Sequence, residues 1–427
     1  MMTMNQKNAE IFALAMGLTS PWKIDSIEFK AVEEAKNSEP GSASKSTQFE
    51  LHVYASYDHV ITQEKVHDHK DRTWRHLDFF QHKAFIHARV PRIIDKKGSV
   101  KQVQVPWARE GSGFTLLFEM FVIELTRQMP VAAVGRMVRE HDTRLWRVIE
   151  AYVEEGRKHQ DFSDVTGVGI DETSSKKGHQ YITVFASLGS HKVIFCCEGR
   201  DSSVIKSFKD DFETHSGNCA KIANVSIDMS KAFISGVKTH LPNAEINFDE
   251  FHVIKAMNEA VNSVRREEAK KRPELKGTRF AWLKNEENQN EDDKEIMNII
   301  NPLKCNWDTA RAYRYKLGLQ ACFSADKDQV EAMLKKWLAG ACRTSLKPVK
   351  DVALMVKRHY DGIVAAIKND ITNGLMEGLN SLIQAAKVKA RGYRNTKTLC
   401  NIVYLMQGGI DFSKCFASDC SVTIHTT

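Results

Sequence analysis

No cysteine precedes Cys196 in this chain of 427 residues, although nine occur from that point on. Two of them, Cys196 and Cys197, are adjacent within an apolar run. This arrangement matches neither the spacing of a zinc site nor that of a disulfide framework. We therefore expect reduced cysteines and an intracellular protein.

Long hydrophobic runs are also missing. No stretch approaches the roughly 18 uninterrupted apolar residues that cross a membrane, and the N-terminus lacks the charged and then apolar pattern of a secretory signal. We expect no membrane partner and a cytoplasmic, nucleoid-associated protein of a prokaryote. The excess of positive charge is small, because 61 Lys and Arg stand against 54 Asp and Glu. This balance is compatible with an anionic partner but does not require one.

The first part of the chain has the pattern of short strands. Strand-like runs at residues 24–32, 49–57, 85–94 and 100–107 are separated by polar or glycine breaks, with a loop of linker composition at 36–46. We expect a small β-rich module at residues 1–110. Seven histidines fall between His52 and His87, and we favour surface histidines over a His-rich metal site.

A helical period begins at Phe114. Apolar residues recur at helical spacing over residues 114–128, 131–141 and 143–156, with a break at Pro130 and an expected N-cap at Asp142 or Thr143. Three helices joined by short turns predict a helix-turn-helix at residues 111–160, although another three-helix bundle would have the same spacing.

Strands and helices then alternate. Strand-like runs end near residues 172, 188 and 199, and a helix, a strand, a helix, a strand and a helix follow up to residue 264. This order predicts a multidomain α/β protein with a ribonuclease-H-like core, a mixed sheet with flanking helices. Its first part would be residues 161–264 and its second part residues 371–427. The charge pattern of residues 265–370 predicts an all-helical insertion, with Trp282, Trp307 and Trp337 in its core.

Three carboxylates stand out within this order. Asp171 and Asp228 each end an apolar strand, and acids at the carboxyl ends of neighbouring strands point into the crevice where ligands bind. Alone, each could be a loop residue or a helix cap. Glu377 lies on a helical stretch whose apolar stripe is expected to comprise Leu375, Leu379, Leu382 and Ala386, and whose polar face comprises Asn373, Glu377, Asn380, Ser381 and Gln384. A solvated glutamate would also fit there.

Three blocks of the sequence, residues 169–188, 226–261 and 373–395, resemble the conserved blocks of DDE transposases of bacterial insertion sequences, in particular the ISL3 family. The resemblance also covers residues 106–115 and the helix-turn-helix. It implies that Asp171, Asp228 and Glu377 are the catalytic acids and the ligands of two Mg²⁺ or Mn²⁺ ions. Such ions prefer hard oxygen ligands and serve in-line displacement at phosphodiesters. We expect Asp171 to bridge both ions.

Several other residues gain a role from this resemblance. Neighbours expected to support the metal ligands rather than bind metal are Glu172, Asp249 and His252. Residues 378–410 contain no acid, so the cations there are expected to contact phosphates, with a solvated basic face as the alternative. The candidates for DNA contact are Lys387, Lys389, Arg391 and Arg394, and in the helix-turn-helix Arg136, Arg139, Arg144 and Arg147.

The N-terminal module departs from the family. Members usually carry a zinc finger with Cys-x-x-Cys pairs, whereas Tyr54 and Tyr57 occupy the first pair here and residues 92–98 replace the second. A thiolate site cannot form, so structural zinc is not predicted.

The function implied is a transposase that binds the terminal inverted repeats of its insertion sequence. It would cut double-stranded DNA at those ends and join the 3′ ends to a target, as a homodimer or higher oligomer on DNA. One alternative is a metal-dependent nuclease of the same fold without strand transfer. The other is a DNA-binding regulator or decayed transposase that uses only its helix-turn-helix.

Overall fold

The computed structural model describes residues 6–18, 20–32, 48–58, 65–94, 98–176, 178, 180–372 and 374–416. The linker-like loop expected at residues 36–46 and the polar-face residue Asn373 lie outside this set. The chain is a mixed α/β protein that divides into two compact units, Met1–His159 with Ile410–Thr427 and Gln160–Gly409. None of the helices within the described ranges is both long and apolar enough to span a membrane.

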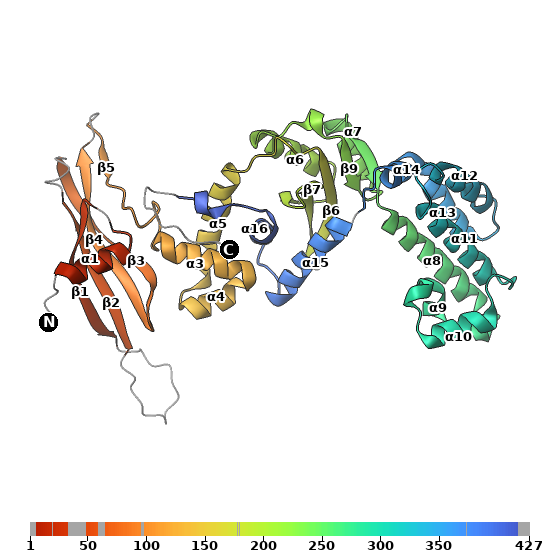
Figure 1. Cartoon of the computed structure of the whole chain (residues 1–427), viewed down its shortest axis with the longest axis horizontal. Helices are drawn as coiled ribbons and strands as arrows, with labels where there is room; N and C mark the ends of the chain where they lie inside the picture. Colours follow the sequence, from red (N-terminus) through yellow and green to blue (C-terminus); the bar gives the residue numbers. More distant parts are fainter. Residues whose placement is uncertain are drawn as a thin grey trace, which may run out of the picture. The chain divides into compact units, whose positions relative to one another are not determined.

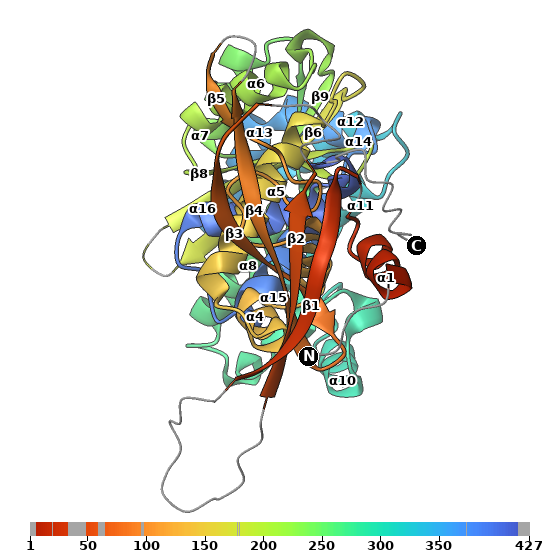
Figure 2. The same cartoon turned by 90° about the vertical axis from the view of Figure 1, so that its left-hand side faces the viewer.

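A five-stranded mixed sheet opens the first unit (Figures 1 and 2). The strand order is β1-β2-β4-β3 with β5 beside β4, and β2 and β4 are parallel while the other neighbours are antiparallel. One face packs around Trp22, Trp74 and Trp107, with ring centroids 4.8 Å apart for the first and last of these. The elements are α1 Gln6–Ala15, β1 Trp22–Val32, β2 Gln48–Tyr57, β3 Val66–Phe79, β4 His82–Ile94 and β5 Val100–Gln102.

The longest strand of this sheet was not expected from the sequence. β3 has 14 residues, but its sequence VHDHKDRTWRHLDF has no regular apolar alternation. Its place is set by antiparallel pairing with β4, in which Trp74 lies opposite the buried Ile86. The strand predicted at residues 100–107 is confirmed only for its first three residues, since Trp107 leaves the sheet and packs into the core.

Three helices complete the first unit: α3 Leu116–Gln128, α4 Val131–Val138 and α5 Asp142–Lys158. The cap expected at Asp142 or Thr143 is instead His141, whose side chain accepts a hydrogen bond from the Thr143 amide. The buried Arg75 of β3 links the sheet to these helices. Its side chain pairs with Asp78 and Glu140, and its backbone bonds with Gly113 and Thr115.

The second unit contains a five-stranded sheet of order β10-β9-β6-β7-β8 (Figure 1). Strands β10, β9 and β6 pair in parallel, whereas β7 pairs antiparallel with both β6 and β8. Strand and helix order along residues 165–264 agrees with the sequence expectation. The bounds are β6 Gly167–Lys176, β7 Gln180–Ser187, β8 Val193–Glu198, α6 Ser203–Thr214, β9 Asn224–Ile227, α7 Lys231–His240, β10 Glu245–Phe248, α15 Gly374–Lys389 and α16 Thr396–Gln407.

A helical region separates β10 from α15. α8 runs without a break across residue 265, where the sequence predicts the insertion to begin. Trp282 and Trp337 are buried and Trp307 packs against the same core, which confirms their expected place. The helices are α8 Glu250–Glu268, α9 Arg279–Leu283, α10 Glu291–Ile300, α11 Asp308–Phe323, α12 Val330–Ala341, α13 Lys347–Arg358 and α14 Tyr360–Lys368.

Two helical glycines should respond in opposite ways to alanine. At Gly362 of α14 a Cβ would lie 2.4 Å from a Phe248 ring atom and 2.9 Å from the Ile246 carbonyl oxygen, whereas at Gly378 of α15 it would meet nothing within 4 Å. We expect Gly362→Ala to lower the free energy of unfolding by about 1–3 kcal/mol through overpacking. Gly378→Ala should raise it by about 0.5–1 kcal/mol through helix propensity. Denaturant titration of both variants measures this, and a gain in stability for Gly362→Ala would contradict the close packing of α14 on β10.

Candidate active site

The strand register brings Asp171 and Asp228 to the same level of the sheet. β6 and β9 are parallel, and their last paired residues are Gly169 and Ser226. Asp171 and Asp228 each follow two residues later, since 171 − 169 = 2 and 228 − 226 = 2. Residues two apart on a strand share a face. The register therefore places the two acids level with each other on neighbouring strands. Asp228 directly follows β9, whereas the prediction that Asp171 ends its strand is wrong, because β6 continues to Lys176.

Asp171 is held through both carboxylate oxygens. Its Oδ1 accepts a hydrogen bond from the Glu172 amide at 2.8 Å, and its Oδ2 accepts one from Asn380 Nδ2 at 2.7 Å. Burial raises the pKa of Asp171 to about 6; the Glu172 amide acts in the opposite direction, Asp228 raises the pKa further and His252 lowers it. These couplings show that Asp228 and His252 lie near Asp171.

Helix α15 lies beside β6 (Figure 1), and Asn380 and Gln384 of its predicted polar face bond to that strand. One and two turns beyond Asn380, Gln384 donates to Thr173 Oγ1 at 2.5 Å and Lys387 donates to the Ser174 carbonyl at 2.6 Å. The buried residues of α15 are Met376, Leu379 and Ile383. The predicted apolar stripe is therefore wrong in part, because Leu382 is 52% exposed. Compared with the sequence prediction, α15 is rotated about its own axis, so that both apolar and polar residues of the helix pack against the second unit.

The close approach of α15 depends on Gly169. A Cβ at this position would lie 2.9 Å from Met376 Sδ and 3.0 Å from Met376 Cγ. A larger residue two positions before Asp171 would require the Met376 side chain to move, or the start of α15 to move away from β6. Glu377 follows Met376 directly and is exposed.

The three predicted supporting residues lie beside the aspartates. Asp249 is 3% exposed and caps α8 by accepting a hydrogen bond from the Phe251 amide at 3.0 Å. His252 Nε2 lies 3.7 Å from Asp249 Oδ2. Burial raises the pKa of Glu172, with Asp228 adding to the effect, and Arg200 opposes it from 3.9 Å.

Glu377 does not join the aspartates in a complete cage. Nowhere in the described ranges do three His, Cys, Asp or Glu side chains lie close enough together to hold a metal ion. The donor set of two level aspartates still fits a hard divalent cation, which takes carboxylate oxygens and completes its shell with water or phosphate. A further oxygen, Asn380 Oδ1, is buried there without a hydrogen-bond partner among the described residues.

The predicted DNA-contact cations fall into two groups. Some serve the fold: Arg139 pairs with Asp78, Arg144 pairs with Glu140 and lies 4.2 Å from the Phe114 ring centroid, and Lys387 bonds to β6. Within the ranges that the structure describes, Arg136 and Arg147 are exposed and make no ion pair. The remaining cations, Lys389, Arg391 and Arg394, are exposed at and beyond the end of α15.

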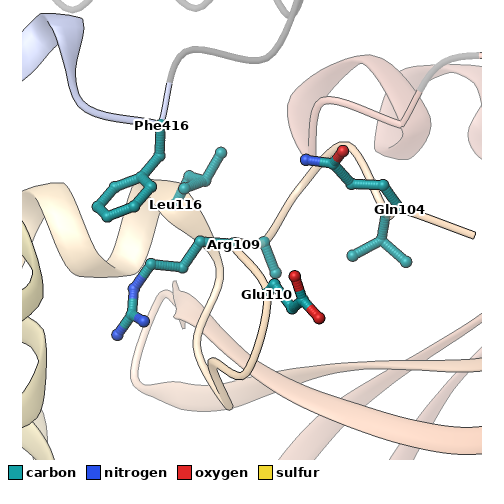
Figure 3. A pocket seen from close by; sticks show the side chains of 7 residues that line it. Gln104, Arg109, Glu110, Leu116 and Phe416 are labelled. Carbon is teal, nitrogen blue, oxygen red and sulfur yellow. The ribbon is translucent and has the colours of Figure 1, made fainter. Parts of the chain in front are cut away.

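A cavity of about 290 Å³ lies elsewhere, in the first unit (Figure 3). Arg109 and Phe416 line it, and the Arg109 guanidinium carbon lies 5.6 Å from the Phe416 ring centroid. Arg109 also bonds to the fully buried Glu119 at 3.0 Å. The Arg109 guanidinium is already paired with Glu119. We therefore interpret this cavity as a feature of the packing and not as a binding site.

Asn380 was expected from the sequence to lie on the polar face of its helix, without a functional role. Its spacing of three residues from Glu377 is the signal that could have singled it out, since residues three apart on a helix are neighbours.

Family models match three segments of the chain. A transposase model matches residues 168–403, and the helix-turn-helix domain of transposase family ISL3 matches residues 103–153. A zinc-finger model of transposases of insertion sequences matches residues 60–94, which speaks against the expectation that the module has no structural zinc. With no cysteine before Cys196, a zinc ion in this segment would need ligands other than thiolates.

Curated relatives agree with these matches. The chain is 28% identical over 371 residues to the transposase for insertion sequence element IS1557 of Mycobacterium tuberculosis, covering 79% of this chain and 82% of the relative. It is 24% identical over 341 residues to the transposase for IS1001 of Bordetella parapertussis, covering 78% and 83%. The transposase model matches more than half of the chain, and the matched range includes Asp171, Asp228 and the helix of Glu377. The chain therefore belongs to the ISL3 family of DDE transposases.

Proposed function

We propose that this protein binds the terminal inverted repeats of its insertion sequence, cuts DNA at their ends and joins the 3′ ends to a target. The observation that carries the proposal is the level placement of Asp171 and Asp228 on parallel strands, with the helix of Glu377 bonded to Asp171 through Asn380. Family membership implies use of a divalent metal.

Asp171, Asp228 and Glu377 would hold two Mg²⁺ or Mn²⁺ ions. When bound, such ions activate the attacking oxygen and stabilise the leaving oxygen of an in-line displacement. The chain contributes orientation: the Glu172 amide and Asn380 hold Asp171, and the Ser230 amide holds Asp228 Oδ1 at 2.9 Å. Glu377 is exposed on the same helix as Asn380, and it would turn toward the aspartates when bound cations offset the repulsion between the acids.

The order of strands supports a ribonuclease-H-like core of residues 161–264 and 371–409; the sequence-based range of 371–427 is too long, because Ile410–Thr427 belong to the first unit. Three antiparallel strands followed by two parallel ones, with helices between, is the expected arrangement. The helical insertion at 265–370, the helix-turn-helix at 111–160 and the β-rich module at 1–110 complete the scheme. Because both ends of an element must be held together, we propose that the protein acts on DNA as a homodimer or higher oligomer.

The exposed arginines of the helix-turn-helix give a prediction for DNA binding. Arg147 lies on α5 and Arg136 on α4, and neither has an ion pair within the described ranges. We expect Arg147→Ala to weaken binding to an inverted-repeat duplex by about 1–3 kcal/mol if it reads a base edge. If Arg136 contacts phosphate, Arg136→Ala should reduce the salt dependence of binding by about one ion.

Arg144 provides the matched control. The Arg144 guanidinium is engaged by Glu140 and Phe114. Arg144→Ala should therefore lower the stability of α5 and change the salt dependence of DNA binding only slightly. Fluorescence anisotropy at several salt concentrations measures all three variants. Unchanged binding by both Arg136→Ala and Arg147→Ala would exclude this face as the DNA contact.

The function itself is tested by product analysis. Labelled DNA carrying the element's ends is incubated with the full chain and Mg²⁺ or Mn²⁺, with EDTA as the control. Cut ends and joined products that both depend on metal support the transposase. Cutting without joining would favour the nuclease alternative, and binding without cutting would favour the regulator or decayed transposase.

A further inference from the structure

Asn380 is a neutral side chain that contacts Asp171, the central carboxylate of the proposed site. Its Nδ2 donates to Asp171 Oδ2 at 2.7 Å, while the Glu172 amide donates to Asp171 Oδ1 at 2.8 Å. Each carboxylate oxygen has two lone pairs, so each keeps one for a cation. The carboxylate is thus oriented from two sides, by its own strand and by α15.

The other end of the same amide lacks a partner. Asn380 Oδ1 is buried and accepts no hydrogen bond from any described residue. The orientation of the amide follows from chemistry, because an ionised carboxylate only accepts and the amide nitrogen must face it. A buried carbonyl without a donor is costly, and a bound water or ion is the usual explanation.

The next polar residues of α15 behave differently. Gln384 donates to Thr173 Oγ1 and to the Ser174 carbonyl, and Lys387 donates to that same carbonyl. These contacts dock the helix on β6 without touching a proposed metal ligand. On this face of the helix, Asn380 is therefore the residue that joins helix docking to the carboxylate of Asp171.

We infer that Asn380 is a positioning residue of the metal centre. Its amide N–H directs the free lone pairs of Asp171 toward the cation, and its carbonyl oxygen accepts a hydrogen bond from a water that the cation carries. Mg²⁺ and Mn²⁺ usually keep several waters, so a buried acceptor beside the ligands is used once the ion is present. The inference rests on the proposed function and adds a neutral fourth side chain to the three acids.

Metal binding without DNA tests the inference directly. The full chain and three variants, Asn380→Leu, Gln384→Leu and Asp228→Asn, are titrated with Mn²⁺ in a calorimeter. We expect Asn380→Leu to weaken Mn²⁺ binding by about 10–100-fold, the usual effect of losing a partner of a metal ligand. Gln384→Leu should bind Mn²⁺ as the wild type does, although both substitutions remove hydrogen bonds between α15 and β6 and should lower the melting temperature to a similar extent.

The possible outcomes test the role of Asn380 and the proposed metal centre separately. Wild-type affinity in Asn380→Leu, or an equal loss in Gln384→Leu, would show that Asn380 only docks the helix and would overturn the inference. If Asn380→Leu does not fold, Asn380→Ala replaces it, since alanine places no apolar group against the carboxylate. If the wild type binds no Mn²⁺, or Asp228→Asn binds it as tightly as the wild type, the proposed metal centre itself fails.

Discussion

Replacing Asp171 or Asp228 by asparagine should abolish DNA cleavage and leave DNA binding intact. Asparagine has the shape of aspartate but no charge, so Asp171→Asn and Asp228→Asn lose the carboxylate that would hold the cation. We expect cleavage rates to fall by at least about a thousandfold, which corresponds to ~4 kcal/mol of transition-state stabilisation. Single-turnover cleavage of labelled element ends measures the rate, and a gel-shift titration in EDTA measures binding.

Asp210 supplies the matched control for this experiment. It lies exposed on α6 in the same unit, so Asp210→Asn removes one negative charge without touching the crevice. Its cleavage rate should equal that of the wild type. Full activity in both Asp171→Asn and Asp228→Asn would move the chemistry away from this site altogether.

Replacing Arg75 by methionine should have the largest effect on stability. The Arg75 side chain is 1% exposed and pairs with Asp78 and Glu140, of which Glu140 is 8% exposed. Its removal takes from Asp78 and Glu140 the buried cation that they share between the sheet and the α4–α5 turn, and leaves each with only an exposed arginine partner, Arg139 or Arg144. Breaking a buried pair in this way costs about 3–5 kcal/mol. Hydrogen exchange of the full chain, read by mass spectrometry on peptides of β3, β4 and α5, measures the loss of protection.

Two comparisons make this result specific. Arg89→Met removes a pair with Asp71 in which the side chains are 76% and 85% exposed, and should change stability by less than about 0.5 kcal/mol. Peptides of β6 and β7 belong to the other unit and should keep their protection in both variants. Unchanged exchange in Arg75→Met would mean that the Arg75 network does not join the sheet to the helices.

Local sequence patterns predicted most elements of the second unit. The apolar runs around residues 165–199 and 222–228 are β6 to β9, and the amphipathic stretches between them are helices. These segments follow the period of their own secondary structure, so they can be read without tertiary context. β3 could not be read in this way, because its polar residues pair with β4 and only part of one face is buried.

The rotation of a helix is harder to read than its position. On α15 the sequence predicted Leu382 inside, whereas Ile383 is buried and Leu382 exposed. One residue is about 100° of helical turn, and a helix with apolar residues on several sides does not specify its own buried face. The same rotation directs Lys387 to β6, where it serves the fold.

The sequence by itself determined the family and the order of strands and helices along residues 165–264, and it singled out three acids as candidates, because these depend on residue type and spacing along the chain. The tertiary structure decided which of those residues meet. The parallel register of β6 and β9 levels Asp171 with Asp228, Gly169 admits α15, and Asn380 then reaches Asp171 from 209 residues away in the chain. Such contacts arise from packing between distant segments, which no local period encodes.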